Sequence, residues 1–277
     1  MTMAMAGRAR TRAAAALAIA CAGVLATMLA GCQSMPKRDT SLESSIVTPS
    51  DESETRRRAR IRLELASGYF GEGKVDIALD ELKQVLAIDP NYGDAYNLRG
   101  LVYMSLRDNA GAADSFRRAL QLNPRDADAA HNYGWLQCQL GHYPDADRLF
   151  DQALSNPIYG GRSKTLMAKG LCQARAGQRA EAEHSLSRSY ELDAGNPVTG
   201  YNLALLLYER GDFKRAQFYI RRLNNSELAN ASSLWLGVKV ERRMNDSEAM
   251  GQLAEQLRKR FPQSRERVLL DKGAFDE

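Results

Sequence analysis

The feature that most constrains the fold of this 277-residue chain is a repeat of about 34 residues. Two sets of small residues carry the repeat, and both recur at intervals of 34, 34, 36, 34 and 33 residues. The first set is Ala78, Ala112, Ala146, Ala182, Ala216 and Ala249. The second set is Ala66, Gly100, Gly134, Gly170, Ala204 and Gly237. Because two positions share one rhythm, the sequence predicts six stacked copies of a single unit.

The spacing inside each copy predicts a pair of helices. Four residues after each alanine of the first set stands a large apolar residue, and these are Leu82, Phe116, Phe150, Leu186, Ile220 and Leu253. Apolar residues three and four apart form one buried stripe on a helix. Four glycines are predicted to end the first helix of their copies: Gly73, Gly141, Gly177 and Gly211. Prolines close the first three copies at Pro90, Pro124 and Pro157.

This order of small, aromatic, alanine, phenylalanine and proline positions resembles the tetratricopeptide repeat. The second copy carries the pattern most completely, at Tyr96, Gly100, Leu101, Tyr103, Ala112, Phe116, Ala119 and Pro124. The resemblance implies an all-α, superhelical solenoid of about six helical hairpins over residues 56–264. An insertion at 158–162 is expected to bend the array or to form a contact loop. The tail over 265–277 is weakly patterned and has no predicted role.

The first 31 residues have the pattern of a secretory signal peptide. Arg8, Arg10 and Arg12 precede an apolar run that ends in Leu29-Ala30-Gly31-Cys32. This ending resembles the bacterial lipobox, which implies cleavage after Gly31 and a lipid on the Cys32 thiol. Gln33 is not the aspartate that resembles an inner-membrane retention signal, so we expect an outer-membrane anchor with the body in the periplasm. An uncleaved membrane-spanning helix is the alternative, disfavoured because the run is mostly alanine.

Residues 32–55 are rich in Ser, Thr, Pro and charge, so they are expected to form a flexible tether behind the lipidated cysteine. The basic run Arg56-Arg57-Arg58 then opens the first helix. It is interpreted as a solvated face in preference to a site for anionic lipid headgroups.

Composition and motifs argue against an enzyme, a metal site, a cofactor or a small-molecule substrate. His131, His142 and His184 stand in different copies without the spacing of a metal site. Phosphate-binding loops and nucleophile motifs are missing from the sequence. Without its three arginines before residue 13 the chain has 35 basic and 34 acidic residues, which disfavours nucleic acid.

Cys138 and Cys172 stand on the predicted first helices of neighbouring copies. A periplasmic location permits a disulfide between them. Because their positions within the repeat differ by two residues, the side chains are not expected to meet, and two buried free thiols are favoured.

Tetratricopeptide arrays resemble one another in binding partners on the face lined by first helices. The residues expected on that face are Leu63, Phe70, Asn97, Leu101, Met104, His131, Trp135, Met167, Leu171, Tyr201 and Tyr208. Apolar surfaces of this kind bind helices or extended peptides. Trp135 and Tyr201 are the expected anchors, and Asn97, Asn132 and Asn202 could bond a peptide backbone. For each residue the alternative is packing within the array.

Longer stretches resemble the type IV pilus biogenesis/stability lipoproteins of the PilF/PilW family. They are Asn156-Pro157-Ile158-Tyr159, Gly170-Leu171-Cys172, Ala176-Gly177, Leu234-Trp235-Leu236-Gly237-Val238, Glu241-Arg242 and Arg260-Phe261-Pro262-Gln263-Ser264. The resemblance implies a pilotin, which binds secretin subunits and helps them reach the outer membrane and assemble there. The alternative is a lipid-anchored adaptor that regulates periplasmic cell-wall enzymes.

Overall fold

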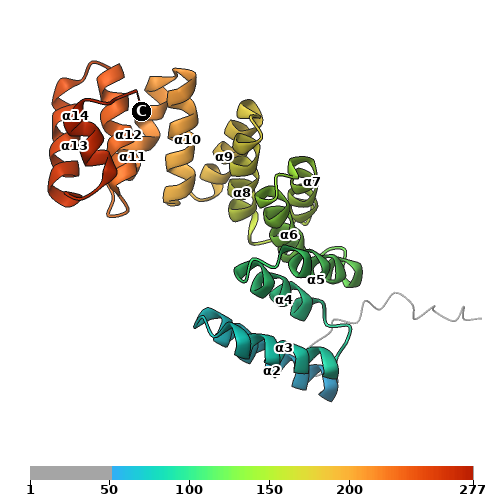
Figure 1. The fold of residues 1–277 in the computed structure, drawn as a ribbon. Helices are drawn as coiled ribbons and strands as arrows, with labels where there is room; N and C mark the ends of the chain where they lie inside the picture. Colours follow the sequence, from blue (N-terminus) through green and yellow to red (C-terminus); the bar gives the residue numbers. More distant parts are fainter. Residues whose placement is uncertain (1–51, 277) are drawn as a thin grey trace, which may run out of the picture. The chain divides into compact units, whose positions relative to one another are not determined.

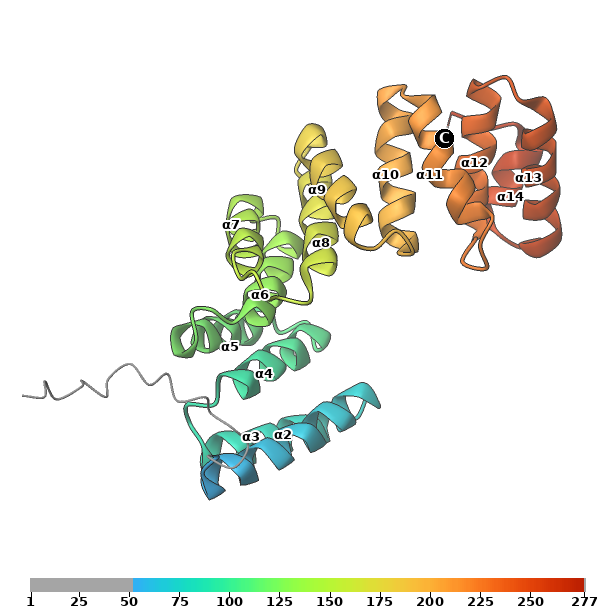
Figure 2. The same cartoon turned by 180° about the vertical axis from the view of Figure 1, so that it is seen from behind.

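The computed structural model describes residues 52–276, and these residues form thirteen α-helices and no strand. Cys32 and residues up to 51 lie outside the described residues, so the signal peptide, the lipid anchor and most of the tether stay predictions. The helices pair in chain order into six hairpins followed by a single helix, an order that can be followed in Figures 1 and 2. The first three hairpins are α2 (Glu54–Gly71) with α3 (Val75–Ile88), α4 (Gly93–Ser105) with α5 (Asn109–Leu122), and α6 (Ala127–Gln139) with α7 (Tyr143–Leu154). The last three are α8 (Arg162–Arg175) with α9 (Arg179–Leu192), α10 (Pro197–Arg210) with α11 (Phe213–Asn224), and α12 (Ala231–Arg243) with α13 (Ser247–Arg260), and α14 (Arg265–Lys272) follows. The predicted all-α hairpin array is confirmed.

The small residues of the repeat allow the two helices of each hairpin to approach closely. A Cβ added at Gly100 would lie 2.5 Å from a ring carbon of Phe116. A Cβ at Gly170 would lie 2.7 Å from Leu186 in the same way. Glycine is therefore required where such a large side chain packs directly against the first helix.

Each hairpin turns through one residue in the left-handed region of φ. Gly73, Gly141, Gly177 and Gly211 have φ between 75° and 87°, as their predicted position requires. The second and sixth hairpins make the same turn at Arg107, with φ of 61°, and at Asn245, with φ of 59°. The glycine pattern did not predict these two turns. The turn requires a left-handed backbone conformation, which glycine adopts most easily but which other residues can also adopt.

The first helices lie on the inner side of the array. Consecutive first helices contact each other from α2 through α12, whereas consecutive second helices of the described residues do not. The face formed by α2, α4, α6, α8, α10 and α12 is therefore the inner face, as expected. None of the helices described is both long and apolar enough to span a bilayer.

The C-terminal tail, for which the sequence suggested no role, caps the array. Helix α14 packs against α12 and α13, and its Leu270 is buried. Beyond it, the ring of Phe275 stacks on Trp235 at a centroid distance of 5.4 Å. The last repeat of such an array has an apolar face with no following repeat to cover it. Here α14 covers that face of α12 and α13, in the place of a seventh hairpin.

Candidate partner-binding face

The residues predicted for the N-terminal part of the inner face are half-buried. Leu63 and Phe70 pack against the apolar core of the first hairpin. Leu101 and Met104 pack against the core that contains Phe116 and Leu136. These side chains pack within the array and stay partly exposed, so their role in binding a partner stays a prediction.

All three predicted amide side chains form hydrogen bonds within the array. Asn132 donates a hydrogen bond of 3.0 Å from Nδ2 to Oδ1 of Asn97, which joins α6 to α4. Asn202 donates from Nδ2 to the carbonyl of Val198 in its own helix at 2.8 Å. The first pair therefore also fixes how neighbouring first helices align.

His131 lies inside the array and not in the groove where the sequence placed it. Its side chain is 5% exposed, and its Nδ1 lies 2.9 Å from Oγ1 of Thr165 on α8. Burial, with a smaller contribution from Lys164, lowers the pKa of His131 to about 4. A neutral imidazole therefore links the third repeat to the fourth.

The insertion at 158–162 completes this link. The Thr165 hydroxyl donates to the Tyr159 hydroxyl at 3.3 Å, and that hydroxyl donates to Asp128 at 3.2 Å. These hydrogen bonds all run in one direction. Nδ1–H of His131 donates to Thr165, and the last bond in the row is accepted by the Asp128 carboxylate. Ile158 of the same insertion is 89% exposed. The insertion therefore forms a structural contact through Tyr159 and leaves Ile158 in solvent.

Trp135 on α6 packs within the array at the junction of the third and fourth repeats. It is half-buried against the cluster that contains Cys138, Phe150 and Cys172. The guanidinium carbon of Arg175 lies 5.2 Å from its ring centroid. The predicted anchor is thus partly covered by an arginine of its own chain, which a partner would have to displace or share.

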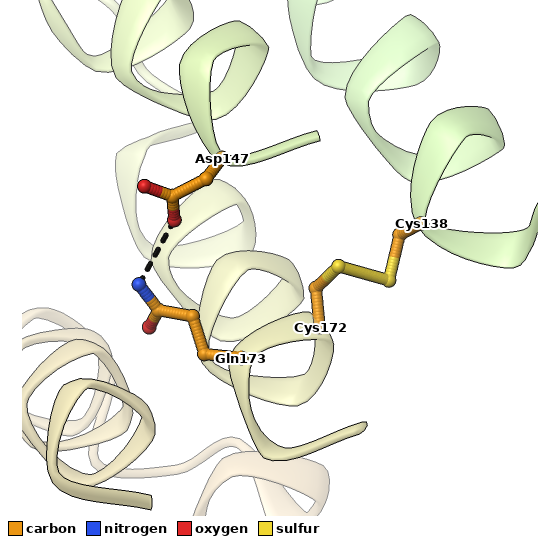
Figure 3. The surroundings of a disulfide bond; sticks show 4 residues. All are labelled: Cys138, Asp147, Cys172 and Gln173. Carbon is orange, nitrogen blue, oxygen red and sulfur yellow. Dashed lines mark hydrogen bonds between the residues drawn. A yellow bond between two sulfur atoms is a disulfide. The ribbon is translucent and has the colours of Figure 1, made fainter. Parts of the chain in front are cut away.

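Cys138 and Cys172 form a disulfide between α6 and α8, with their Cα atoms 5.7 Å apart (Figure 3). The next residue, Gln173, points to the other neighbouring helix, where its Nε2 donates a hydrogen bond of 2.9 Å to Asp147 on α7. The expectation of two free thiols was therefore wrong.

The reason lies in the two-residue offset that had argued against the bond. Equivalent positions on two stacked helices point the same way, so they cannot face each other. An offset of two residues turns a side chain by about 200°, onto the opposite side of its helix. Cys138 and Cys172 are 34 residues apart where the repeat is 36, and His131 and Thr165 share this separation. The shared offset turns both pairs toward each other across the same junction.

Tyr201 differs from the other predicted residues because it lines two cavities of the inner face. One has a volume of about 620 Å³ and lies between α10 and the start of α12. The other, of about 210 Å³, extends toward α14. The C-terminal end of the face is therefore hollowed at a predicted anchor. Among the residues described here, no group of three or more His, Cys, Asp or Glu side chains could hold a metal ion.

Comparison with known proteins agrees with this geometry. Tetratricopeptide-repeat family models match residues 63–130 and 115–148. The crystal structure of PilW, described as a widely conserved type IV pilus biogenesis factor, superposes with a TM-score of 0.70 at 29% identity, over 77% of this chain and 99% of that one. The chain is a tetratricopeptide-repeat solenoid that resembles PilF and PilW.

The type IV pilus assembly protein PilF of Pseudomonas aeruginosa is 26% identical over 204 residues, which cover 74% of this chain and 81% of the relative. A solved structure of Pseudomonas aeruginosa PilF has a TM-score of 0.73 at 24% identity and covers 80% of this chain and 100% of that one. The resemblance extends over most of the array, including repeats that the family models do not match.

Proposed function

We propose that this protein acts in type IV pilus biogenesis as an outer-membrane lipoprotein that binds secretin subunits and promotes their localisation and assembly. The observation that carries the proposal is the similarity to PilF and PilW over about three quarters of the chain. The lipobox-like sequence at Cys32 supports the anchor. The half-buried apolar inner face supports protein binding.

The proposed mechanism consists of anchoring and binding and involves no chemical reaction. A lipid on Cys32 gives the membrane address, and the tether over 32–55 gives the array reach. A subunit bound to the inner face is then held at high local concentration near its neighbours. The same contact covers apolar surface that would otherwise aggregate.

The test uses cells that lack the gene and are complemented with variants of the full chain. Heat- and detergent-resistant secretin multimers are measured in outer-membrane fractions. Cys32→Ala tests the anchor, and the double change Leu101→Glu with Met104→Glu tests the inner face. Ile77→Glu is the matched control, because Ile77 is 45% exposed on a second helix. We expect the first two variants to lose multimers and the control to keep them, at equal amounts of folded protein.

Wild-type amounts of multimer in the deletion strain would remove the secretin role. The adaptor for cell-wall enzymes would then be the function to test. Multimers that are lost only in the Cys32 variant would retain the lipid anchor but place the contact elsewhere than at Leu101 and Met104.

A further inference from the structure

A polar cavity lies between the second helices of the fifth and sixth repeats, away from the inner face. Its lining comes mainly from α11 and α13, with one residue of α12, and its volume is about 310 Å³. Glu248, Gln252 and Gln256 recur every four residues on α13 and line the cavity with one polar stripe. All three are exposed, so the cavity opens to the surface and is accessible to a side chain from another protein.

Asn224 of α11 lines this cavity and differs from its equivalents, which lie eight residues after each alanine of the first set. The equivalent residues of the other five repeats are Leu86, Leu120, Leu154, Tyr190 and Leu257. Asn224 is 6% exposed, and its Nδ2 donates to the carbonyl of Ser233 at 3.0 Å. This bond fixes the orientation of the amide, and Oδ1 accepts no hydrogen bond from any residue of the described region. Because a buried amide with an unsatisfied oxygen costs free energy that leucine would not, the asparagine indicates a binding role.

The charges of the cavity favour a cation. Three carboxylates line it, and Arg221 is the one cationic residue among its lining residues. Arg221 donates to Glu241 at 2.7 Å and to Asp246 at 2.9 Å, so these two carboxylates are engaged. Glu248 forms no ion pair within residues 52–276, and its carboxylate accepts from the amide of Gln252 at 3.3 Å. The cavity therefore combines an uncompensated carboxylate with the amide oxygen of Asn224.

We propose that this cavity binds the guanidinium group of an arginine side chain on a partner protein. A guanidinium keeps its charge and presents five N–H donors in one plane, so it can donate to a carboxylate and to an amide oxygen together. Glu248 accepts the charge-assisted bond, Asn224 accepts at the buried end, and Gln252 and Gln256 offer further acceptors at the rim. The site is separate from the inner face, so it does not depend on the secretin contact.

The experiment titrates the full chain in lipid nanodiscs with peptides and follows methyl NMR signals. Ala249 and Leu253 line the cavity, so shifts of their methyl signals locate binding there. The probe is the peptide Gly-Ser-Gly-Ser-Arg-Ser-Gly-Ser-Gly, and two matched peptides carry citrulline or lysine in place of the arginine. Free L-arginine is the fourth ligand. We expect the probe to bind at least about tenfold more tightly than the citrulline peptide and about threefold more tightly than the lysine peptide.

Variants of the chain separate binding from packing. Asn224→Leu introduces the residue that four other repeats carry, and it is expected to weaken binding of the probe by about tenfold without lowering the melting temperature. Glu248→Gln, an exposed change, is expected to weaken binding by about fivefold. Glu255→Gln is the matched control, because Glu255 is exposed on the same helix and does not line the cavity.

Equal affinity for the probe and either matched peptide would overturn the proposal, as would unchanged binding by folded Glu248→Gln. A lower melting temperature of Asn224→Leu with unchanged binding would leave the amide a packing role alone. Binding of free L-arginine without binding of the probe would make the cavity a small-molecule site. Methyl shifts caused by raising the protein concentration alone would make it an interface between two copies of this chain. Because no secretin is present, this result is independent of the multimer assay.

Discussion

The first three repeats and the last three form the same helical hairpin, but they differ in how many polar side chains they bury. Up to residue 157, the buried polar side chains of the described region are Ser115, His131 and Gln137. After it they are Thr165, Gln173, Ser185, Ser189, Thr199, Asn224, Ser233 and Glu241. The family models match only residues 63–148, within the more apolar half. The hairpin geometry therefore tolerates polar interiors, provided that the buried groups find partners.

In the C-terminal half specific pairs satisfy several of these groups, whereas Oδ1 of Asn224 has no hydrogen-bond partner among the described residues. Ser189 of α9 donates to the carbonyl of Ser163 on α8 at 2.9 Å and lies 3.2 Å from Thr199 of α10. Glu241 is 0% exposed and accepts from Arg221 and from Gln217, each at 2.7 Å. Such pairs select one register between helices, where apolar contacts alone would allow more slippage.

The largest expected effect comes at the junction between the two halves. Removing the disulfide with Cys138→Ser is expected to cost about 3–4 kcal/mol of unfolding free energy, from the chain entropy of the loop it closes. Urea denaturation with and without reductant measures the cost. Reductant should lower the urea midpoint of the wild-type protein toward that of the variant and leave the midpoint of the variant unchanged. An unchanged wild-type midpoint would show that the halves hold together without the bond.

The next effect tests the buried charge in the C-terminal half. Arg221→Met leaves Glu241 buried without its guanidinium and is expected to cost about 3 kcal/mol. The matched control is Arg188→Met, because Arg188 and Glu191 form an exposed pair worth less than about 1 kcal/mol. Thermal and urea denaturation compare the two variants. Equal losses would mean that the buried pair does not hold the last repeats together.

Acidification is expected to weaken the junction through His131. Its pKa is about 4 when folded, below the ordinary value of 6.5, so the unfolded chain binds more protons between these values. Stability therefore falls as the pH drops from 6.5 toward 4, by about 3 kcal/mol for this group. His131→Gln should flatten the pH dependence of the melting temperature. His184→Gln, at an exposed position, should leave the wild-type slope intact.

The smallest effect concerns the turns that differ among the repeats. Arg107→Gly should raise stability by about 1 kcal/mol, because glycine adopts the left-handed turn without the Cβ penalty. Gly141→Ala should lower it by a similar amount, and nothing within 4 Å of the added Cβ provides another cause. Melting temperatures of both variants check the signs. A loss in Arg107→Gly would mean that the arginine side chain contributes more than the turn costs.

The period and the small residues were sufficient to predict the six hairpins and the face formed by their first helices. These features are local, since helix periodicity, close approach and turns depend on residues within one copy. The same local pattern could not reveal that α14 caps the array, because eight weakly patterned residues become a helix through packing on α12 and α13.

The tertiary structure alone decided how neighbouring repeats face each other. It paired Cys138 with Cys172, which the comparison of repeat positions had kept apart. It also buried His131 against Thr165, although the sequence had placed His131 on the partner-binding face. It also placed Tyr201 between two cavities that draw on α10, α12 and α14. A repeat period fixes which residues are equivalent. Which residues touch depends on the rotation of each helix against the next, and that rotation is set by packing over the whole interface.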